Sequence, residues 1–327
     1  MSQIALDSRA TFTCHEFLHK KYAPNCFPNL VEDQPSKLAE LLSNMGFAHE
    51  QEIVTNLKNW IGNWVEIDNP GSTSSNTSLA EQTVSALLNP EVQVIFQPIL
   101  NNEVGKLLAL HFGFEFMPSV RMSRPDLLIR SQNISSQNPS WIPVDIKSHS
   151  ASEENSSSKV RAGVSKSLNP FDGAVKFERL KKDDALQLAH YYSHLHEFNI
   201  ADDDSWSGII GRDGDITWAQ LTEQKYGRGK NPPNAIDIYQ EQFETSKHVV
   251  ELAIARNKNP AVLAPAQPFY VNDAKFCSGC KYWSACSLEL RQFAGQGHAS
   301  LLAGVNRSNA DRLPTLSISA LSKASAD

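Results

Sequence analysis

Residues 141–147 read Trp-Ile-Pro-Val-Asp-Ile-Lys, an apolar run that closes on two charged side chains. Side chains alternate between the two faces of a β-strand, so Asp145 and Lys147 point to the same side of the strand predicted here. Pro143 has no amide hydrogen and argues against pairing of the first half of the run as a central strand. The run predicts a strand that presents a carboxylate and an ammonium together.

A second predicted strand opens on another carboxylate, because residues 124–129 read Arg-Pro-Asp-Leu-Leu-Ile. If the two strands are neighbours, Asp126, Asp145 and Lys147 lie within reach of one point. Carboxylate oxygens suit Mg²⁺ or Mn²⁺, and an ammonium would stabilise charge on a phosphate or help position a water. The simpler alternative is that Asp126 belongs to a turn and that Asp145 and Lys147 form a surface ion pair.

Periodicity along the rest of the chain predicts an α/β protein. Helices are expected at residues 38–60, 79–88, 183–198 and 235–256, and strands at 92–96, 107–116, 127–129 and 141–147. Asp213-Gly214 predicts a hairpin turn between strands at 208–211 and 216–218. Residues 69–78 are expected to form a surface loop, and the segment from 148 to about 171 is too polar to help build a core.

Two helices carry further candidate residues. Gln187 and Tyr191 are four residues apart and therefore share a helix face. The Gln187 amide could hold a phosphate or orient the lysine, and Tyr191 could stack on a base or bond the nucleic-acid backbone. His49 lies within the apolar stripe of residues 38–60, and Glu50 lies at its edge. One of these two is expected to complete the metal site, and the sequence does not decide which.

Three of the five cysteines are clustered, since Cys277, Cys280 and Cys286 form a CxxC-x5-C pattern. In a reducing compartment an odd number of clustered cysteines favours metal ligation over disulfides. Four thiolates could hold an iron–sulfur cluster or a structural zinc ion, and spacing does not separate these. Cys14 and Cys26 are the two candidates for a fourth ligand.

The composition is that of an ordinary globular protein, with 327 residues, 41% hydrophobic and 20% charged. A net charge of −6 is unlike that of a protein dominated by phosphate contacts, although it does not exclude nucleic acid. Residues 1–7 show no basic region followed by an apolar run, so no signal peptide is expected, and no apolar run approaches membrane-spanning length. We therefore expect a cytoplasmic protein with no membrane partner.

The order of these motifs resembles the RecB-family nucleases of the PD-(D/E)xK superfamily. The matching positions are His49 or Glu50 after Gly46, then Pro125-Asp126, Asp145-Ile146-Lys147 and Gln187-x-x-x-Tyr191. The cysteines on either side of this core resemble the iron–sulfur version of the family, which includes AddB and the CRISPR-associated exonucleases. The family often has His four residues after the glycine, where this chain has Glu50. The polar insert between Ser131 and Ser140 also lengthens the gap between the aspartates.

The resemblance implies a restriction-endonuclease-like mixed sheet flanked by helices, with N- and C-terminal segments joined at a [4Fe–4S] cluster. It implies that Asp126, Asp145 and the Ile146 carbonyl bind Mg²⁺ or Mn²⁺ and that Lys147, Gln187 and Tyr191 serve catalysis. Cys14 is favoured over Cys26 as the fourth cluster ligand, because residues 12–18 resemble the N-terminal cysteine helix of the family and Cys26 lies between prolines.

The function implied is metal-dependent DNA cleavage, as an exonuclease on ends or single strands, in repair, recombination or defence. DNA is the expected partner, together with a helicase or other nucleic-acid-processing protein. The expected regions are a cluster segment (1–30), a nuclease core (31–200), a helical and cysteine region (201–295) and a tail (296–327). The alternative is a non-catalytic nucleic-acid-binding module with a structural zinc or iron–sulfur site.

Overall fold

The computed structural model describes residues 4–11, 14–67, 76–132, 138–152, 161–165, 168–170, 174–177, 179–261, 277 and 280–293. The chain forms two compact units, which we call the sheet unit (Met1–Phe12 and Asn44–Phe243) and the cysteine unit (Thr13–Ser43 and Glu244–Asp327). This division differs from the expected regions, because residues 201–243 belong with the predicted core. The expected tail, 296–327, lies outside the described residues.

The sheet unit contains one mixed sheet of eight strands in the order β1-β2-β3-β4-β7-β8-β5-β6. The strands are β1 (Trp64–Glu66), β2 (Val94–Phe96), β3 (Leu127–Arg130), β4 (Trp141–Ile146), β5 (Arg161–Ser165), β6 (Ala174–Phe177), β7 (Trp206–Ile210) and β8 (Ile216–Gln220). The β1/β2 and β4/β7 pairs are parallel, and the remaining pairs are antiparallel. The expected α/β class with a mixed sheet and flanking helices is confirmed.

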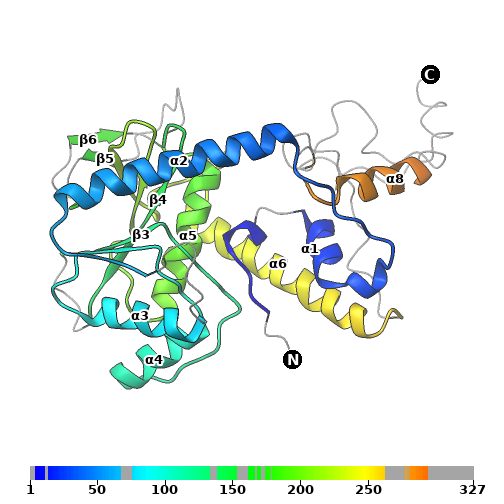
Figure 1. Ribbon diagram of the computed structural model, residues 1–327, viewed down its shortest axis with the longest axis horizontal. Helices are drawn as coiled ribbons and strands as arrows, with labels where there is room; N and C mark the ends of the chain where they lie inside the picture. Colours follow the sequence, from blue (N-terminus) through cyan, green and yellow to red (C-terminus); the bar gives the residue numbers. More distant parts are fainter. Residues whose placement is uncertain are drawn as a thin grey trace. The chain divides into compact units, whose positions relative to one another are not determined.

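Helices cover both faces of this sheet (Figure 1). The α-helices are α1 (His15–Tyr22), α2 (Lys37–Trp60), α3 (Asn76–Leu88), α4 (Asn102–Phe112), α5 (Lys182–Glu197), α6 (Ala235–Lys258) and α8 (Trp283–Phe293). Short 3₁₀ helices lie at Ser8–Thr11 and Pro24–Cys26. Within the described ranges, no helix combines the length and apolar composition that crossing a bilayer requires.

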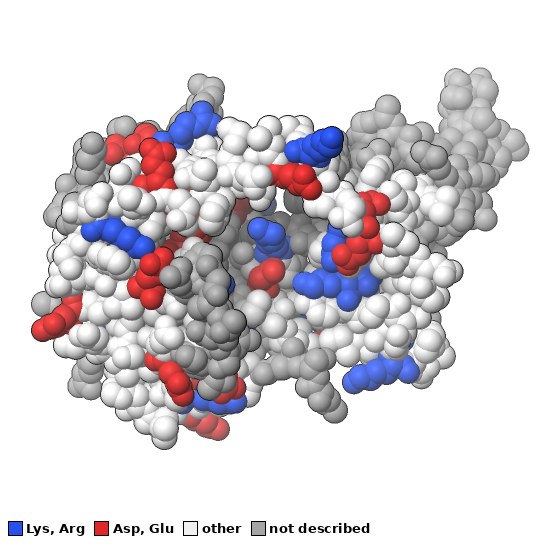
Figure 2. All heavy atoms as spheres, viewed as in Figure 1, with Lys and Arg blue, Asp and Glu red and all other residues white. Residues whose placement is uncertain are grey.

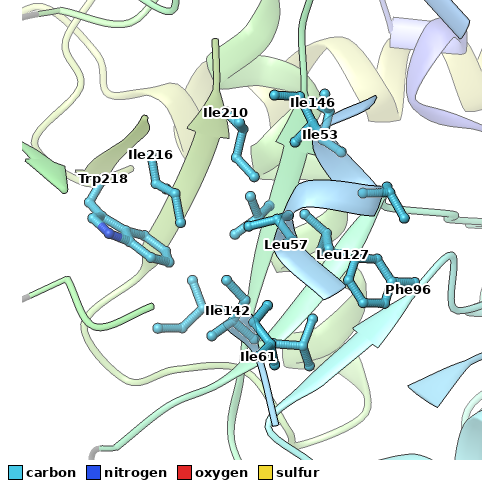
Figure 3. Packing of buried hydrophobic residues seen from close by; sticks show 14 of the residues in the cluster. Ile53, Leu57, Ile61, Phe96, Leu127, Ile142, Ile146, Ile210, Ile216 and Trp218 are labelled. Carbon is cyan, nitrogen blue, oxygen red and sulfur yellow. The ribbon is translucent and has the colours of Figure 1, made fainter. Parts of the chain in front are cut away.

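The sheet has an apolar core on each of its two faces. On one face, Ile53 and Leu57 of α2, with Ile61 just after the helix, pack against strand residues that include Leu127 and Ile146 (Figure 3). The other core joins residues of α3, α4 and α5 to alternate strand positions, among them Ile95, Leu128 and Trp141. Because side chains alternate along a strand, these two sets fix the direction of every residue in β3 and β4.

One strand prediction is wrong, because residues 107–112 of the strand expected at 107–116 belong to helix α4 (Asn102–Phe112). The Asn101 side chain caps the helix by accepting hydrogen bonds from the amides of Glu103 and Val104. Gly113 ends it in the left-handed conformation, with φ of 74°. Both capping signals are in the sequence, since Asn101 lies before the apolar run that suggested a strand and Gly113 lies within it.

The polar segment after Lys147 also differs from expectation, because Arg161–Ser165 forms β5 and pairs with both β6 and β8. Most of the predicted loop at 69–78 lies outside the described residues, and α3 begins within it at Asn76. The expected helices α2, α5 and α6 are confirmed, as is the hairpin of β7 and β8. Pro143 lies inside β4 opposite Leu128, where pairing with β7 has not yet begun.

The cysteine unit joins segments from both ends of the chain. The Asp33 amide donates to the Lys281 carbonyl at 2.6 Å, and the Asp33 carboxylate accepts from the Ser284 amide at 2.8 Å. The rings of Phe17 and Tyr282 lie 5.2 Å apart. Helix α1 and the start of α8 are therefore held together by backbone and aromatic contacts.

Candidate active site and cysteine site

Four strand ends meet at one end of the sheet. The Gln97 amide, just after β2, donates to the Asp126 carbonyl just before β3 at 2.8 Å. The Lys147 amide, just after β4, donates to the Ile210 carbonyl at the end of β7 at 2.8 Å. Val144 and Ile146 face α2, so Asp145 and Lys147 face the opposite side, toward α5. Asp126 faces that side as well, because Leu127 faces α2.

The two predicted aspartates lie together. Asp145 is 2% exposed, and its side chain contacts that of Asp126. The pKa of Asp126 is raised well above its ordinary value, mainly by burial and then by the charges of Asp145 and Glu50. One Asp126 oxygen also accepts a hydrogen bond from the Ile146 amide at 2.6 Å. The expected role of the Ile146 carbonyl as a metal ligand stays a prediction.

Lys147 is held between acidic and amide groups. Its ammonium forms an ion pair with Asp145 and donates to the Gln187 side-chain oxygen at 2.9 Å. Burial alone would lower the lysine pKa, but the neighbouring carboxylates, Asp145 above all, raise it above its ordinary value. Lys147 therefore stays charged at neutral pH, which excludes a role as general base in this state.

Gln187 and Tyr191 continue this chain of hydrogen bonds along α5. The Gln187 amide nitrogen donates to the Tyr191 hydroxyl at 2.6 Å, and Tyr191 also bonds Ser8. Tyr191 is 5% exposed, which leaves no open ring face for stacking on a base. Burial and the charge of Asp145 raise the tyrosine pKa well above its ordinary value, so the hydroxyl remains protonated. Of the roles expected for Gln187, the geometry fits orientation of the lysine.

The structure brings Glu50 to the aspartates. Glu50 accepts a hydrogen bond from the Gln97 side chain at 2.9 Å, and its charge acts on Asp126. In the described part of the chain, His49 Nε2 is buried and makes no hydrogen bond. Between the two candidates, Glu50 is the one whose position suits a metal site.

Gln97 was not predicted from the sequence, although it links two parts of the site. Its side chain donates to Glu50 and accepts from Arg124 at 3.4 Å. Its backbone is in the left-handed region, with φ of 50°. Such a conformation costs a non-glycine residue about 1 kcal/mol, and strained residues of this kind concentrate at functional sites. No spacing rule reveals it, because the contact depends on how β2 ends beside β3.

Asp184 is the second residue near the site that was not predicted from the sequence. It lies in the first turn of α5, three residues before Gln187, and is 6% exposed. Burial raises its pKa, while His149 and Lys147 act in the opposite direction. The available signal was its spacing from Gln187, which places both residues on one face of the helix.

Two neutral histidines of α5 fix the segment that leads to Asp126. His194 Nδ1 bonds the Ser123 hydroxyl at 2.9 Å, and His190 Nε2 bonds the Met122 carbonyl at 3.0 Å. Burial lowers the pKa of His190 to about 4 and also holds that of His194 well below its ordinary value. Both rings are therefore uncharged at neutral pH. They tie the chain just before Asp126 to the helix that carries Gln187.

The cysteine unit places Cys14, at the start of α1, close to Cys280. Burial raises the pKa of Cys280 above its ordinary value, and the Cys14 thiol adds to the effect. Cys277 and Cys280 are joined by a backbone hydrogen bond of 3.1 Å, and Cys286 lies in α8. The Cys26 thiol instead donates to the Arg256 carbonyl at 3.6 Å. These positions favour Cys14 over Cys26 as a partner of the C-terminal cysteines.

Neither candidate metal site is preformed in ideal geometry. Among the described residues, no three His, Cys, Asp or Glu side chains converge closely enough to hold a cation as they stand. The donor chemistry nevertheless fits. Carboxylates crowded closely enough for Asp145 and Glu50 to raise the Asp126 pKa favour a hard divalent cation, and adjacent half-buried thiols favour a thiolate-bound metal.

Charged residues on the face drawn in Figure 2 are of both signs and interspersed. Of the basic residues near Asp126, Arg121 is buried and pairs with Glu197, and Arg130 donates to the carbonyls of Val92, Leu87 and Asn89. These two arginines stabilise the fold. Arg124 is exposed, and its side chain donates to the Gln97 side-chain oxygen.

The local geometry thus joins, through direct contacts or charge, six predicted residues of the sheet unit: Glu50, Asp126, Asp145, Lys147, Gln187 and Tyr191.

Comparison of the chain with protein-family models, with curated proteins and with solved structures finds no match.

Proposed function

We propose that this chain is a metal-dependent nuclease that hydrolyses phosphodiester bonds in DNA. The observation that carries the proposal is the meeting of Asp126, Asp145 and Lys147 at one end of the sheet, with Lys147 held by Gln187. A turn residue and a surface ion pair would not produce this arrangement. Asp145 is buried, and a surface pair would leave it solvated.

Each residue has a role that follows from its contacts. A bound Mg²⁺ or Mn²⁺ would polarise the scissile phosphate and acidify the attacking water. Asp126, Asp145 and Glu50 would hold that cation. The charges of Asp145 and Glu50 already raise the Asp126 pKa, so the three carboxylates lie near one another. The Lys147 ammonium would donate to the phosphate oxygen on which charge develops. Gln187 would fix its direction, and the buried Tyr191 would fix Gln187.

The architecture supports a restriction-endonuclease-like core of the RecB type. The mixed sheet has helices on both faces, and the motif residues fall on α2, β3, β4 and α5 in the order of the resemblance. Asp126 precedes β3, and Asp145 and Lys147 close β4, its antiparallel neighbour. The strand pairing that the motif requires is therefore present.

For the cysteine unit we propose a structural [4Fe–4S] cluster held by Cys14, Cys277, Cys280 and Cys286. The proximity of Cys14 to Cys280 supports it. A zinc ion on the same thiolates is the alternative. Protein purified without oxygen should be brown and contain iron and sulfide, whereas colourless protein with stoichiometric zinc would contradict the cluster.

A cleavage assay tests the enzymatic proposal. The purified full chain is incubated with linear and circular DNA, each single- and double-stranded, with Mg²⁺, Mn²⁺ or EDTA. We expect cation-dependent cleavage of linear DNA that EDTA abolishes. DNA binding without cleavage under any of these conditions would favour a non-catalytic nucleic-acid-binding module instead.

A further inference from the structure

Asp184 is a buried carboxylate with an unused oxygen beside the candidate active site. It is 6% exposed, and its Oδ2 makes no hydrogen bond. A buried carboxylate oxygen without a hydrogen bond is costly, so the position of Oδ2 favours a nearby positive charge. The helix turn that carries it also carries Gln187, which binds Lys147.

The charged groups around Asp184 come from three segments. Lys147 and Asp145 come from the end of β4, His149 follows them with Nε2 at 3.7 Å from Asp184 Oδ1, and Lys181 begins α5. The Lys181 ammonium is turned to His149 Nδ1, at 3.2 Å. The Lys147 ammonium forms an ion pair with Asp145 and donates to the neutral Gln187 oxygen, and the charge of Asp184 acts on it as well.

We infer that Asp184 is the positioning residue for Lys147, and that the Lys147 ammonium fills a latent second cation site formed by Asp145 and Asp184. The active site then takes one divalent cation, not two. This inference rests on the proposed function for its meaning, since it fixes how many cations the nuclease would use. It assigns Asp184 no contact with substrate.

Binding of the cation would change the charges that hold the Lys147 ammonium in place. Asp145 is then shared with a divalent charge, which weakens its attraction for the ammonium. Among the groups named above that face Lys147, Asp184 is the carboxylate not assigned to the cation. It would keep the ammonium beside the phosphate while Gln187 sets its direction.

Counting bound Mn²⁺ tests this without any cleavage assay. Electron paramagnetic resonance of free Mn²⁺ gives the stoichiometry for the chain that keeps its cysteine-held metal and has been freed of other divalent cations. We expect one Mn²⁺ per wild-type chain, two for Lys147→Met, and one again for Lys147→Met combined with Asp184→Asn. Asp183→Asn is the matched control, an exposed carboxylate in the same helix turn, and should leave the wild-type value unchanged.

Two results would overturn the inference. If the wild type binds two Mn²⁺ and Asp184→Asn binds one, Asp184 is itself a ligand. If folded Lys147→Met, checked by circular dichroism, still binds one, the latent site does not exist. If Lys147→Met does not fold, the Mn²⁺ count and the cleavage rate of Asp184→Asn test the inference. This variant should keep one Mn²⁺ and lower the cleavage rate about tenfold, an effect typical of groups that orient active-site residues, and an unchanged rate would overturn the inference.

Failure of the inference and failure of the proposed function are separable. The one-two-one series of Mn²⁺ counts can hold in a protein that cleaves no DNA, in which case the nuclease proposal fails alone. Cation-dependent cleavage that requires Asp145, together with a single Mn²⁺ in Lys147→Met, would leave the nuclease proposal standing and remove the latent site.

Discussion

Asp126 is the residue whose environment makes the strongest prediction about pH. Its folded pKa is raised above the ordinary 3.8 by burial and by Asp145 and Glu50. Between 3.8 and the raised value, the folded chain therefore holds a proton that the unfolded chain has lost. Stability of the metal-free protein falls as pH rises through that window.

Asp126→Asn should remove this pH dependence. In EDTA, we expect the variant to have a higher melting temperature than the wild type near neutral pH, with the difference shrinking as the pH falls toward 4. Thermal unfolding followed by circular dichroism at several pH values measures it. A variant that melts below the wild type near pH 7 would mean that Asp126 is stabilising in its ionised form.

Gln187 makes the second prediction at this scale, because its amide joins Lys147 to Tyr191. Gln187→Ala should lower the cleavage rate about 10- to 100-fold, since it frees the ammonium that Gln187 orients. Cation affinity should not change. Gln51→Ala, at an exposed glutamine of α2, is the control for removing such a side chain. Equal rates for the two variants would exclude the positioning role.

At the scale of elements, two helical glycines should respond in opposite ways to alanine. A Cβ at Gly46 in α2 would meet nothing within 4 Å, whereas one at Gly105 in α4 would lie 2.4 Å from Phe116 and 2.7 Å from Phe198. We expect Gly46→Ala to raise the unfolding free energy by roughly 0.5–1 kcal/mol, because alanine is the better helix former. Gly105→Ala should lower it by about 1–3 kcal/mol through overpacking.

Urea unfolding of the two variants checks this pair. Destabilisation by Gly46→Ala would show that the start of α2 packs more closely than described. A neutral Gly105→Ala would show that the two phenylalanine rings move aside.

Elements with a regular apolar pattern were predictable, and α4 shows where such a pattern misleads. Residues 107–116 are apolar enough for a strand, yet Asn101 and Gly113 cap a helix that begins before the run and ends within it. The motif on β3 and β4 was predictable because alternation fixes which side chains share a face. The contacts of Gln97 and Asp184 were not, since they depend on which strands and helices become neighbours.

At the scale of the whole molecule, the cysteine unit predicts that metal content depends on Cys14 and Cys280 but not on Cys26. Cys280→Ser should lose the bound iron or zinc and lower the melting temperature, because a structural metal stabilises the folded chain. Cys26→Ser should retain the metal, since that thiol contacts the Arg256 carbonyl. Metal analysis and visible absorbance measure the metal content of both variants. Loss of metal in Cys26→Ser would mean that Cys26, and not Cys14, is the fourth ligand.

Cleavage of DNA is proposed to take place at the carboxylate site where β3 begins and β4 ends. Its most direct test compares wild type and Asp145→Asn, purified without oxygen and matched in visible spectrum, on end-labelled linear DNA with Mn²⁺. The account predicts cleavage by the wild type and a loss of at least about 100-fold in the variant, as expected when a group essential to charge stabilisation is removed. Equal cleavage by both proteins would contradict it.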